Sequence, residues 1–447
     1  MKRMAMPSAQ HPFFLERRFA IAARGSSVAR EIAAGLTTFL AAAYLVAVIP
    51  SLLATGGMDR GAATTAVLLM LAGGSIAMGL YANLPFIVGP GIGGSALLGA
   101  TLAQMPGIGW QTGLGIALIS GLLFLMLTLS GAREIVVRLV PLPIKLGLGA
   151  SIGLFIAMLG FRDAGMVTVN AKTNAMALAD LTQPSPVMAL AGLAVALAMG
   201  ARRIPGAVVA GIAVAALIGL PLGVTHFEAA VSLPHGIRPI ALHADPLAAL
   251  SLAAFPYMFA FFAAEFFSTL GTTLAIGGKA ALTDASGNLP GIRKPFLVDA
   301  AAATIGPMIG IPAATALIES AAGVEAGGRT GLTPIVAAIL FLLCLFLLPI
   351  AMAVPRQATA PALILIGISM IATIRKLPGD EPTELFAPIA MMLVTLIANS
   401  FGTGIAAGIL LYVAVELLAG RIRKVPVGLI LLAIPLGYYL YAAFKPH

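Results

Sequence analysis

The chain has 447 residues, of which 60% are hydrophobic and only 10% are charged, and its mean hydropathy is +1.03. Soluble domains carry about 25% charged residues, so this composition excludes a soluble globular protein and indicates an integral membrane protein. The formal net charge of +9 does not indicate nucleic-acid binding, because the basic residues lie in tails and loops, as the positive-inside rule expects.

Apolar runs long enough to cross about 30 Å of hydrocarbon recur from residue 31 to residue 443. Strands of a membrane β-barrel would appear as short alternating segments instead, so we predict an all-α polytopic membrane protein. Fourteen spans are expected, at roughly 31–55, 62–81, 84–104, 110–130, 144–162, 184–201, 204–221, 247–276, 293–311, 312–328, 332–353, 361–375, 384–399 and 402–419. A further apolar stretch, 425–443, either spans the membrane or lies along its interface, and the pattern does not separate the two.

The first thirty residues are basic and polar, without an apolar segment that precedes a small-residue cleavage site. We therefore expect 1–30 to be a cytoplasmic tail and the first span to act as its own insertion signal. With this orientation, 20 of the 26 Lys and Arg residues fall inside and 5 fall outside, while Lys445 is undecided because the last stretch is. This asymmetry supports both the orientation and the number of spans.

The longest polar connection, residues 222–246, contains three histidines and divides the spans into two sets of seven. Because seven is odd, a second copy would insert upside down relative to the first, which is a recurring transporter plan. A weak internal match supports a repeat: "VPLPIKLGLGASIGLFIAML" from Val140 is similar to "VPRQATAPALILIGISMIAT" from Val354, and Ile152-Gly153 matches Ile366-Gly367. The sequence thus predicts a 7+7 inverted repeat with 222–246 as an external linker.

Two spans contain helix-breaking residues at corresponding places in the two sets. The third, "LPFIVGPGIGGSALLGA", holds Pro85, Pro90 and several glycines, and the tenth, "GIPAATALIESAAGVEAGG", holds Pro312. Unpaired backbone groups at membrane depth cost several kcal/mol unless they line a polar cavity or bond each other, so paired breaks indicate one central site with free amide donors. The alternative is that the glycines only allow close helix packing.

Three acidic residues stand within apolar runs, where a carboxylate costs roughly 2.5 to 3.5 kcal/mol to insert. For Glu319 and Glu265 we expect a substrate-binding or coupling role, and a buried structural hydrogen bond is the alternative. Burial favours the uncharged form of a carboxyl group, so either Glu is a candidate proton carrier. Asp299 lies within six residues of Arg293 and Lys294, so a solvated ion pair is expected as readily as a function.

Hydroxyl side chains also cluster in these spans, and each is expected to bond the preceding helical turn rather than a ligand. They are Thr37, Thr38 and Tyr44 in the first span, Ser95 in the third, and Thr269, Thr272 and Thr273 in the eighth. Ser268 is the exception and is expected to contact a ligand, because it lies one turn after Glu265 on the same helix face.

At these residues the sequence resembles the azaguanine-type purine permeases, a branch of the nucleobase transporters that carry hypoxanthine, guanine and adenine. The resemblance covers essentially the whole chain, and its specific signals are "ESAAGVEAGGRTGLT" and "GLYANLPF". Less specific strings are "EIAAGLTTFLAAAYL", "WQTGLGIALISGLLFLMLTLSGARE" and "ATAPALILIG".

The resemblance implies a core domain of spans 1–4 and 8–11 and a gate domain of spans 5–7 and 12–14, with the substrate between the third and tenth spans and with proton symport. The segments implied are the core at 31–130 and 247–353, the gate at 131–221 and 354–419, the linker at 222–246, and a basic loop with the apolar C-terminal segment at 420–447. A homodimer is also implied by the resemblance alone.

The sequence departs from the family pattern around this site. Glu319 matches the family's acidic residue in the tenth span, but of the two acids expected in the eighth span only the first is kept, as Glu265, and Ser268 replaces the second. Ser95 stands where the family has Asn, and Ala41 where it has a polar residue. Either Glu265 takes the role of the missing acid, or the substrate differs.

We predict a secondary transporter, not an enzyme, which takes up a purine nucleobase with protons by alternating access and needs no cofactor. Substrate contacts are expected from Glu319, Glu265, Ser268, Ser95, Phe267, Gly93, Gly94 and Thr315, and proton coupling from Glu265 and Glu319. Alternatives are a transporter of the same fold for another nucleobase-like solute or an anion, a channel, and an intramembrane enzyme. An enzyme is disfavoured because every His lies in a tail or the long loop, so no metal site is expected. We expect a bacterial inner membrane.

Overall fold

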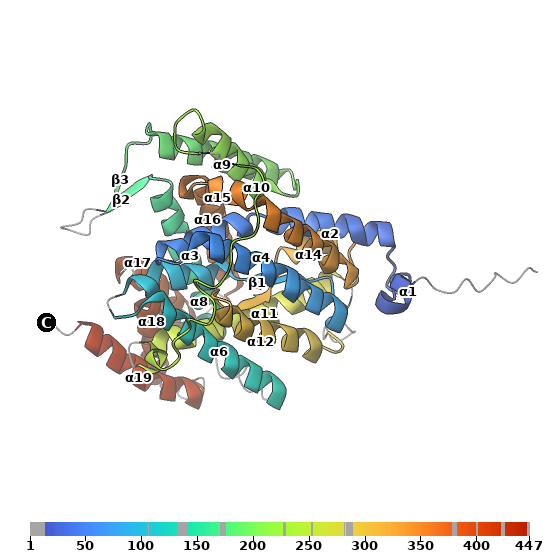
Figure 1. Cartoon of the computed structure of the whole chain (residues 1–447). Helices are drawn as coiled ribbons and strands as arrows, with labels where there is room; N and C mark the ends of the chain where they lie inside the picture. Colours follow the sequence, from blue (N-terminus) through green and yellow to red (C-terminus); the bar gives the residue numbers. More distant parts are fainter. Residues whose placement is uncertain are drawn as a thin grey trace, which may run out of the picture.

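The chain folds into a bundle of apolar helices (Figure 1). This computed structural model describes residues 14–105, 107–131, 141–169, 176–226, 229–251, 254–280, 282, 289–377, 382–398, 401–421 and 425–444. Within these ranges, seven helices are long and apolar enough to cross a membrane, and four further apolar helices are shorter. The predicted all-α membrane fold is confirmed.

The helices of the first half follow the predicted spans closely. They are α2 (Val28–Ala42) running into α3 (Leu45–Thr55), α4 (Arg60–Ala77) running into the π-helical turn η1 (Met78–Ala82), α6 (Trp110–Ser130), α8 (Leu142–Asp163), α9 (Pro184–Ala201) and α10 (Ala207–Gly219). A short helix, α1 (Phe14–Phe19), precedes them, and a small hairpin of β2 (Val167–Val169) and β3 (Met176–Leu178) follows α8.

The second half repeats this plan. Its helices are α11 (Phe255–Lys279), α12 (Arg293–Met308), α14 (Leu332–Cys344) with η5 (Leu345–Leu347) and α15 (Leu348–Ala353), α16 (Arg356–Ile371) with η6 (Ala372–Lys376), α17 (Pro382–Ala398) and α18 (Phe401–Leu418). The eighth span begins at Phe255 and not at residue 247, because Ala248–Leu250 forms a separate 3-10 turn, η4, and Pro256 suits the first turn of a new helix. The stretch 425–443 is helical as α19 (Val427–Phe444), which packs on α18.

The third and tenth spans are broken, as their prolines and glycines predict. The third consists of a strand, β1 (Val88–Pro90), and the short helices α5 (Ile92–Ala96), η2 (Leu97–Thr101) and η3 (Leu102–Gln104). The tenth consists of a strand, β4 (Ala314–Ala316), and α13 (Ser320–Glu325). The two strands pair antiparallel inside the bundle, with Gly89 opposite Thr315 (Figure 1). Thus the two breaks satisfy much of each other's backbone.

Side chains of neighbouring helices complete this crossing. The Val88 amide donates to the Ser75 hydroxyl of α4 at 3.0 Å, and the Ile87 amide donates to the Ser320 hydroxyl of α13 at 3.0 Å. Buried backbone amides without partners would be costly. The serines therefore fix the strands to the helices beside them.

Helix packing divides the bundle into two groups. One group, α2, α3, α4, α6, α11, α12 and α14, forms a connected set that packs around the two broken helices. The other group consists of α8, α9, α10, α16, α17 and α18. The weak internal match lies at the heart of the second group, where Gly153 of α8 faces Gly367 of α16. A Cβ on Gly153 would lie 2.7 Å from the Gly367 carbonyl oxygen. The paired glycines let α8 and α16 cross in close contact.

Candidate functional site

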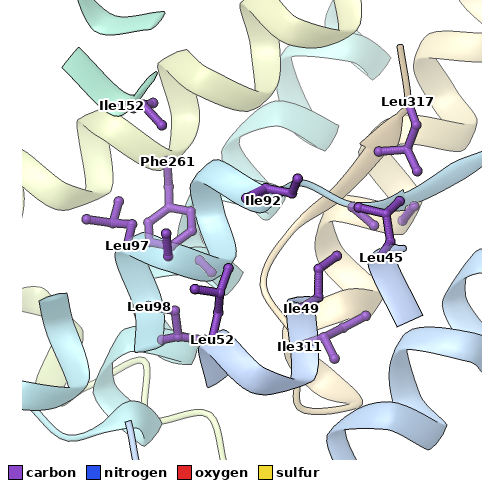
Figure 2. Close-up of a cluster of buried hydrophobic side chains, with 14 of the residues drawn as sticks. Leu45, Ile49, Leu52, Ile92, Leu97, Leu98, Ile152, Phe261, Ile311 and Leu317 are labelled. Carbon is purple, nitrogen blue, oxygen red and sulfur yellow. The ribbon is translucent and has the colours of Figure 1, made fainter. Parts of the chain in front are cut away.

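The two short helices that follow the strands begin beside the strand crossing, among apolar side chains from several helices. Figure 2 shows Ile92 of α5 between Phe261 of α11 on one side and Leu45 of α3 and Leu317 on the other. Ile92 and Phe261 are both buried. Polar groups at this place are therefore few, and each one can be traced.

Glu265 of α11 reaches the start of α5. Its carboxylate oxygen Oε1 lies 3.6 Å from where a Cβ on Gly94 would stand and 3.9 Å from that of Gly91. The side chain is only 5% exposed, and no described residue gives its other oxygen, Oε2, a hydrogen bond. A buried carboxylate oxygen without a partner is costly, so this group is suited to accept a hydrogen bond from a ligand or to hold a proton.

Apolar groups form the walls beside this carboxylate. A Cβ on Gly94 would lie 3.3 Å from the Phe261 ring and 3.6 Å from Pro312, and a Cβ on Gly93 would lie 3.0 Å from Ile152 of α8. Side chains larger than hydrogen at these two positions would close the space. The predicted residues Gly93 and Gly94 therefore keep open the region between Glu265, Phe261 and the second helix group.

Glu319 stands at the start of the other short helix, where it is the residue before α13. Its carboxylate accepts a hydrogen bond from the hydroxyl of Tyr44, which is 4% exposed at the junction of α2 and α3. The expectation that Tyr44 bonds its own helix is wrong, because a phenol hydroxyl stands too far from the backbone of its own turn and here reaches the opposite repeat.

Asp299 supports β4 from behind. Its Oδ2 accepts hydrogen bonds from the Ala316 amide at 3.0 Å and the Thr315 hydroxyl at 3.2 Å, and Thr315 is also 2.7 Å from the hydroxyl of Thr269 in α11. The side chain is fully buried, so the expected solvated ion pair with Arg293 or Lys294 is wrong. Because Thr269 lies one turn after Glu265 on α11, this chain of hydroxyl groups links Asp299 to the side of α11 that carries Glu265.

The remaining hydroxyl groups differ in their partners, and the buried hydroxyl of Thr273 has none among the described residues, unlike the expectation. Thr37, Thr38 and Ser95 donate to carbonyls four residues earlier, at 2.9, 2.9 and 2.8 Å, as expected for helical hydroxyls. In Ser95 the oxygen lone pairs stay available. Thr269 departs from the expectation by bonding Thr315. Phe267 and Ser268 lie within α11, but their side chains are outside the part that the structure describes.

The two most specific sequence signals extend from this crossing, where Glu319 begins one of them, to the end of the bundle that carries α1, which we call the α1 face. Glu31 of α2 is fully buried and accepts hydrogen bonds from the Arg329 amide at 2.9 Å and the Thr333 hydroxyl at 2.5 Å. Asn83 has a left-handed backbone, with φ of 52°, and its side chain accepts from the Gly331 amide at 2.8 Å. Apart from Glu319, the parts of these signals at the α1 face thus stabilise loops.

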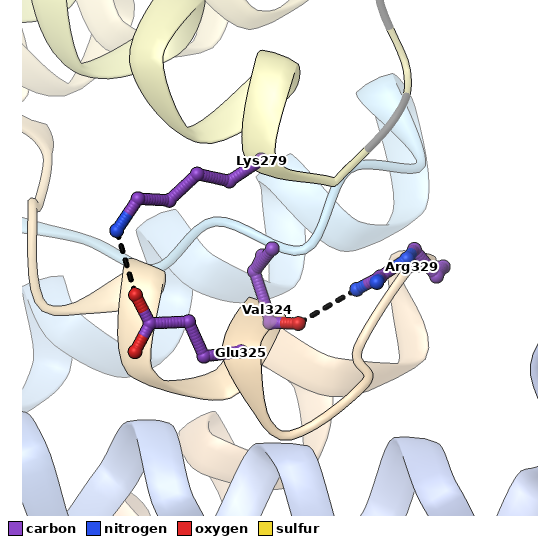
Figure 3. A network of polar contacts seen from close by, with 4 residues as sticks. All are labelled: Lys279, Val324, Glu325 and Arg329. Carbon is purple, nitrogen blue, oxygen red and sulfur yellow. Dashed lines mark hydrogen bonds and ion pairs between the residues drawn. The ribbon is translucent and has the colours of Figure 1, made fainter. Parts of the chain in front are cut away.

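The same face carries an exposed ion pair, drawn in Figure 3. Lys279 at the end of α11 contacts Glu325 of α13 at 2.6 Å, and the Arg329 side chain donates to the Val324 carbonyl at 2.7 Å. Exposed pairs of this kind contribute little stability, typically below about 1 kcal/mol. They fix the end of α13 opposite Glu319. In the described part of the chain, no three His, Cys, Asp or Glu side chains gather in a way that could hold a metal ion.

Comparison with known proteins places these features in a family. Residues 29–406 match the model described as Permease family. The chain is 34% identical to the adenine permease AdeP of Escherichia coli, over 94% of this chain and 94% of the relative. It is 34% identical to the guanine/hypoxanthine permease PbuO of Bacillus subtilis, over 90% of this chain and 94% of the relative, and 33% identical to the guanine/hypoxanthine permease GhxP of E. coli O157:H7, over 97% and 98%.

Solved structures share the fold at much lower identity. The transmembrane domain of the cyanobacterial bicarbonate transporter BicA matches with a TM-score of 0.59 and 14% identity, over 85% of this chain and 97% of that chain. The murine anion transporter Slc26a9 in its inward-facing state matches with a TM-score of 0.64 and 12% identity, over 94% and 74%. These likenesses support the predicted 7+7 inverted repeat.

Proposed function

We propose, on the premise that this chain belongs to the Permease family and is a membrane transporter of that family, that it takes up a purine nucleobase together with protons. The observation that carries the proposal is that each of the two helix breaks has its own glutamate, Glu265 at α5 and Glu319 at α13. Ring N–H groups of an uncharged purine are hydrogen-bond donors, and two carboxylates supply acceptors for them. The names and identities of the relatives support the purine class.

The substrate would lie between the two breaks. Phe261 and Ile152 give apolar surfaces for a planar ring, while Gly93 and Gly94 leave room for it. Ser95 has its hydroxyl proton engaged with the Gly91 carbonyl, so only its oxygen is open to a substrate donor. Thr315 contributes indirectly, because its hydroxyl joins Thr269 and Asp299. We keep Phe267 and Ser268 as further contacts proposed from the sequence alone.

Glu265 is proposed to take the role of the family's second acidic residue, which is replaced by Ser268 in this chain. One of its oxygens has no hydrogen bond from the described residues, and its position against α5 allows it to accept from a substrate without help from residue 268. This reading removes the need for a different substrate to explain the departure. The other reading, a nucleobase-like solute with fewer donors, is separated by the uptake experiment below.

Alternating access would come from movement between the two helix groups, with the core at 31–130 and 247–353 and the gate at 131–221 and 354–419. The contact of Ile152 in α8 with the Gly93 region lies between the groups and is apolar, so it can slide without breaking hydrogen bonds. The helix group to which each segment packs supports this assignment.

Protons are proposed as the coupling ion because Glu265 and Asp299 are both buried at the crossing, where the described residues give neither a basic partner. Thr269, one turn after Glu265, is joined to Asp299 through Thr315. Ionising both groups there would be costly, whereas binding one proton removes a charge. Glu319 differs, since Tyr44 already donates to it. We therefore assign the first protonation to Glu265. An anion substrate is disfavoured, because no Lys or Arg among the described residues lies at either break.

Orientation and location are also proposals. We place the α1 face in the cytoplasm and the chain in a bacterial inner membrane, where it could pair as a homodimer. In a Cys344→Ser background, a cysteine at Arg17 should react with an impermeant maleimide only after the cells are opened, and a cysteine at Leu178 should react in intact cells. The reverse pattern would refute the orientation.

Uptake by cells that lack their own purine permeases tests the function. Labelled hypoxanthine, guanine, adenine, uracil and xanthine would be offered with and without a proton uncoupler. We expect uncoupler-sensitive accumulation of at least one purine, its loss in Glu319→Gln, and its retention in Glu325→Gln, which changes an exposed carboxylate on the same short helix. If the protein reaches the membrane and no purine accumulates, the substrate assignment is wrong.

A further inference from the structure

A cavity that neither Glu265 nor Glu319 lines lies between α4 and α12. It holds about 460 Å³, within the range of small-molecule sites, and every described residue that lines it is apolar apart from the Tyr81 hydroxyl. Its floor is made by small residues, among them Gly73, Gly74 and Ala301, and its edges by larger, exposed ones such as Leu69 and Ile305. We call this cavity the α4–α12 groove.

The groove has a positively charged end at the α1 face. Lys294, the second residue of α12, lies with its ammonium 5.9 Å from the centre of the Tyr81 ring, and Tyr81 lines the groove. Arg18 of α1 donates to the carbonyl of Leu80, the residue next to Tyr81. Both basic residues are exposed. The positive charge of Lys294 and Arg18 therefore lies at the end of the α4–α12 groove that is nearest the α1 face.

The length of the groove suits one lipid tail. Its lining on α12 runs from Leu297, one turn from Lys294, to Ile309, which is about 18 Å at 1.5 Å per residue. One leaflet of hydrocarbon is about 15 Å deep, half of the usual 30 Å core. A phospholipid with its headgroup at Lys294 would thus place an acyl chain along the whole groove.

We propose that the α4–α12 groove binds one anionic phospholipid of the leaflet at the α1 face, with its phosphate at Lys294 and Arg18 and one acyl chain between the helices. Basic residues at the end of an apolar groove are the chemistry that selects anionic over zwitterionic headgroups. A zwitterionic lipid would also offer a phosphate, but its quaternary ammonium adds a positive charge beside Lys294 and Arg18, so it would bind less tightly.

The bound lipid would stand directly behind the strand crossing. A Cβ on Gly74, which lines the groove, would lie 3.0 Å from the Val88 side chain of β1, and Val298 precedes Asp299, which holds the Ala316 amide of β4. The lipid would therefore support α4 and α12, the two helices that pack against the strands, on the face opposite the substrate.

Native mass spectrometry of the purified full chain, titrated with phosphatidylglycerol or phosphatidylcholine of equal acyl length, tests this site without any transport assay. We expect the wild type to bind phosphatidylglycerol at least fivefold more tightly. Lys294→Gln should reduce that preference to within twofold. Gly73→Leu should weaken the binding of both lipids at least fivefold, because the larger side chain would occupy the groove. A Cβ on Gly73 meets no atom within 4 Å, so the protein itself can accommodate the substitution.

Two matched variants act as controls: Lys376→Gln, an exposed basic residue of η6, and Gly200→Leu, a helical glycine of α9 with open space around it. Both should bind lipid as the wild type does. Thermal unfolding confirms that each variant is folded, and Ala301→Leu on the opposite wall replaces Gly73→Leu if the latter is not. Equal affinity of the wild type for the two lipids, or unchanged affinity in the groove-filling variant, would overturn the proposal.

Discussion

The two broken helices meet in one pair of strands, yet their acidic residues are in different states. At α13, Glu319 already accepts a hydrogen bond from Tyr44 of the other repeat. At α5, Glu265 keeps a buried oxygen that has no hydrogen-bond partner among the described residues. The inverted repeat thus places a glutamate at each break, but the surrounding side chains give the two different roles. The carboxylate of Glu319 is already oriented by Tyr44, whereas that of Glu265 is available for a ligand or a proton.

The largest expected effect comes from removing charge at either break. A hydrogen bond to a charged group contributes about 1.5 to 3 kcal/mol, so Glu265→Gln and Glu319→Gln should each reduce purine affinity by about 10- to 150-fold. Glu416→Gln is the control for Glu265, because Glu416 of α18 is also buried, and the described residues give one of its oxygens no hydrogen bond. Equal losses in all three variants would mean that the effect is not specific to the breaks.

Coupling should separate the two acids. If Glu265 takes the proton, Glu265→Gln should still exchange labelled for unlabelled purine across vesicle membranes but lose uncoupler-sensitive accumulation. In Glu319→Gln both activities should fall together, because its role is in binding. Counterflow and accumulation measured on the same vesicles would decide this. A Glu265→Gln protein that still concentrates purine when a proton gradient is imposed would contradict the assignment.

Stability should depend on the support behind β4. Asp299→Ala would leave the buried Ala316 amide without its side-chain acceptor, at a cost of about 1 to 3 kcal/mol, and would remove one partner of the Thr315 hydroxyl. We expect a lower unfolding temperature for Asp299→Ala and a smaller decrease for Asp299→Asn, which keeps an acceptor oxygen. Ser75→Ala makes the same comparison at β1, where only the hydrogen bond from the Val88 amide is lost. An unchanged unfolding temperature in Asp299→Ala would refute the supporting role.

The orienting role of Tyr44 predicts a smaller effect. Tyr44→Phe removes the hydroxyl that donates to Glu319 but keeps the buried ring, so purine affinity should fall by about 2- to 12-fold, the equivalent of about 0.5 to 1.5 kcal/mol. Combined with Glu319→Gln, it should cause little additional loss, since the two residues act as one unit. Fully additive losses would show that Tyr44 acts elsewhere, for example through the apolar cavity that it also lines.

Ser95→Ala should have the smallest effect. The Ser95 hydroxyl proton is engaged with Gly91, so the substrate can use only the oxygen lone pairs, and we expect about a twofold loss of affinity. Thr38→Ala, whose hydroxyl is bonded in the same way but lies on α2, should cause none. A loss above tenfold in Ser95→Ala would make Ser95 a principal contact.

Much of the fold could be predicted from the sequence because membrane spans are long and their breaks are marked by Pro90 and Pro312. Glu265 and Glu319 were identifiable because a carboxylate within an apolar run is costly. The Tyr44 contact was not, since it joins residues 275 positions apart in opposite repeats. Asp299 was misjudged because nearby basic residues in sequence are not near in space. The specific string around Asn83 proved to organise a loop.

The central claim is that one purine binds between the two breaks and contacts both glutamates. Isothermal titration of the purified protein with the transported purine would test it most directly, with wild type, Glu265→Gln, Glu319→Gln and the double variant measured in the same detergent. We expect one site per chain, a Kd about 10- to 150-fold weaker in each single variant, and no measurable binding in the double variant. Wild-type affinity in either single variant would contradict it.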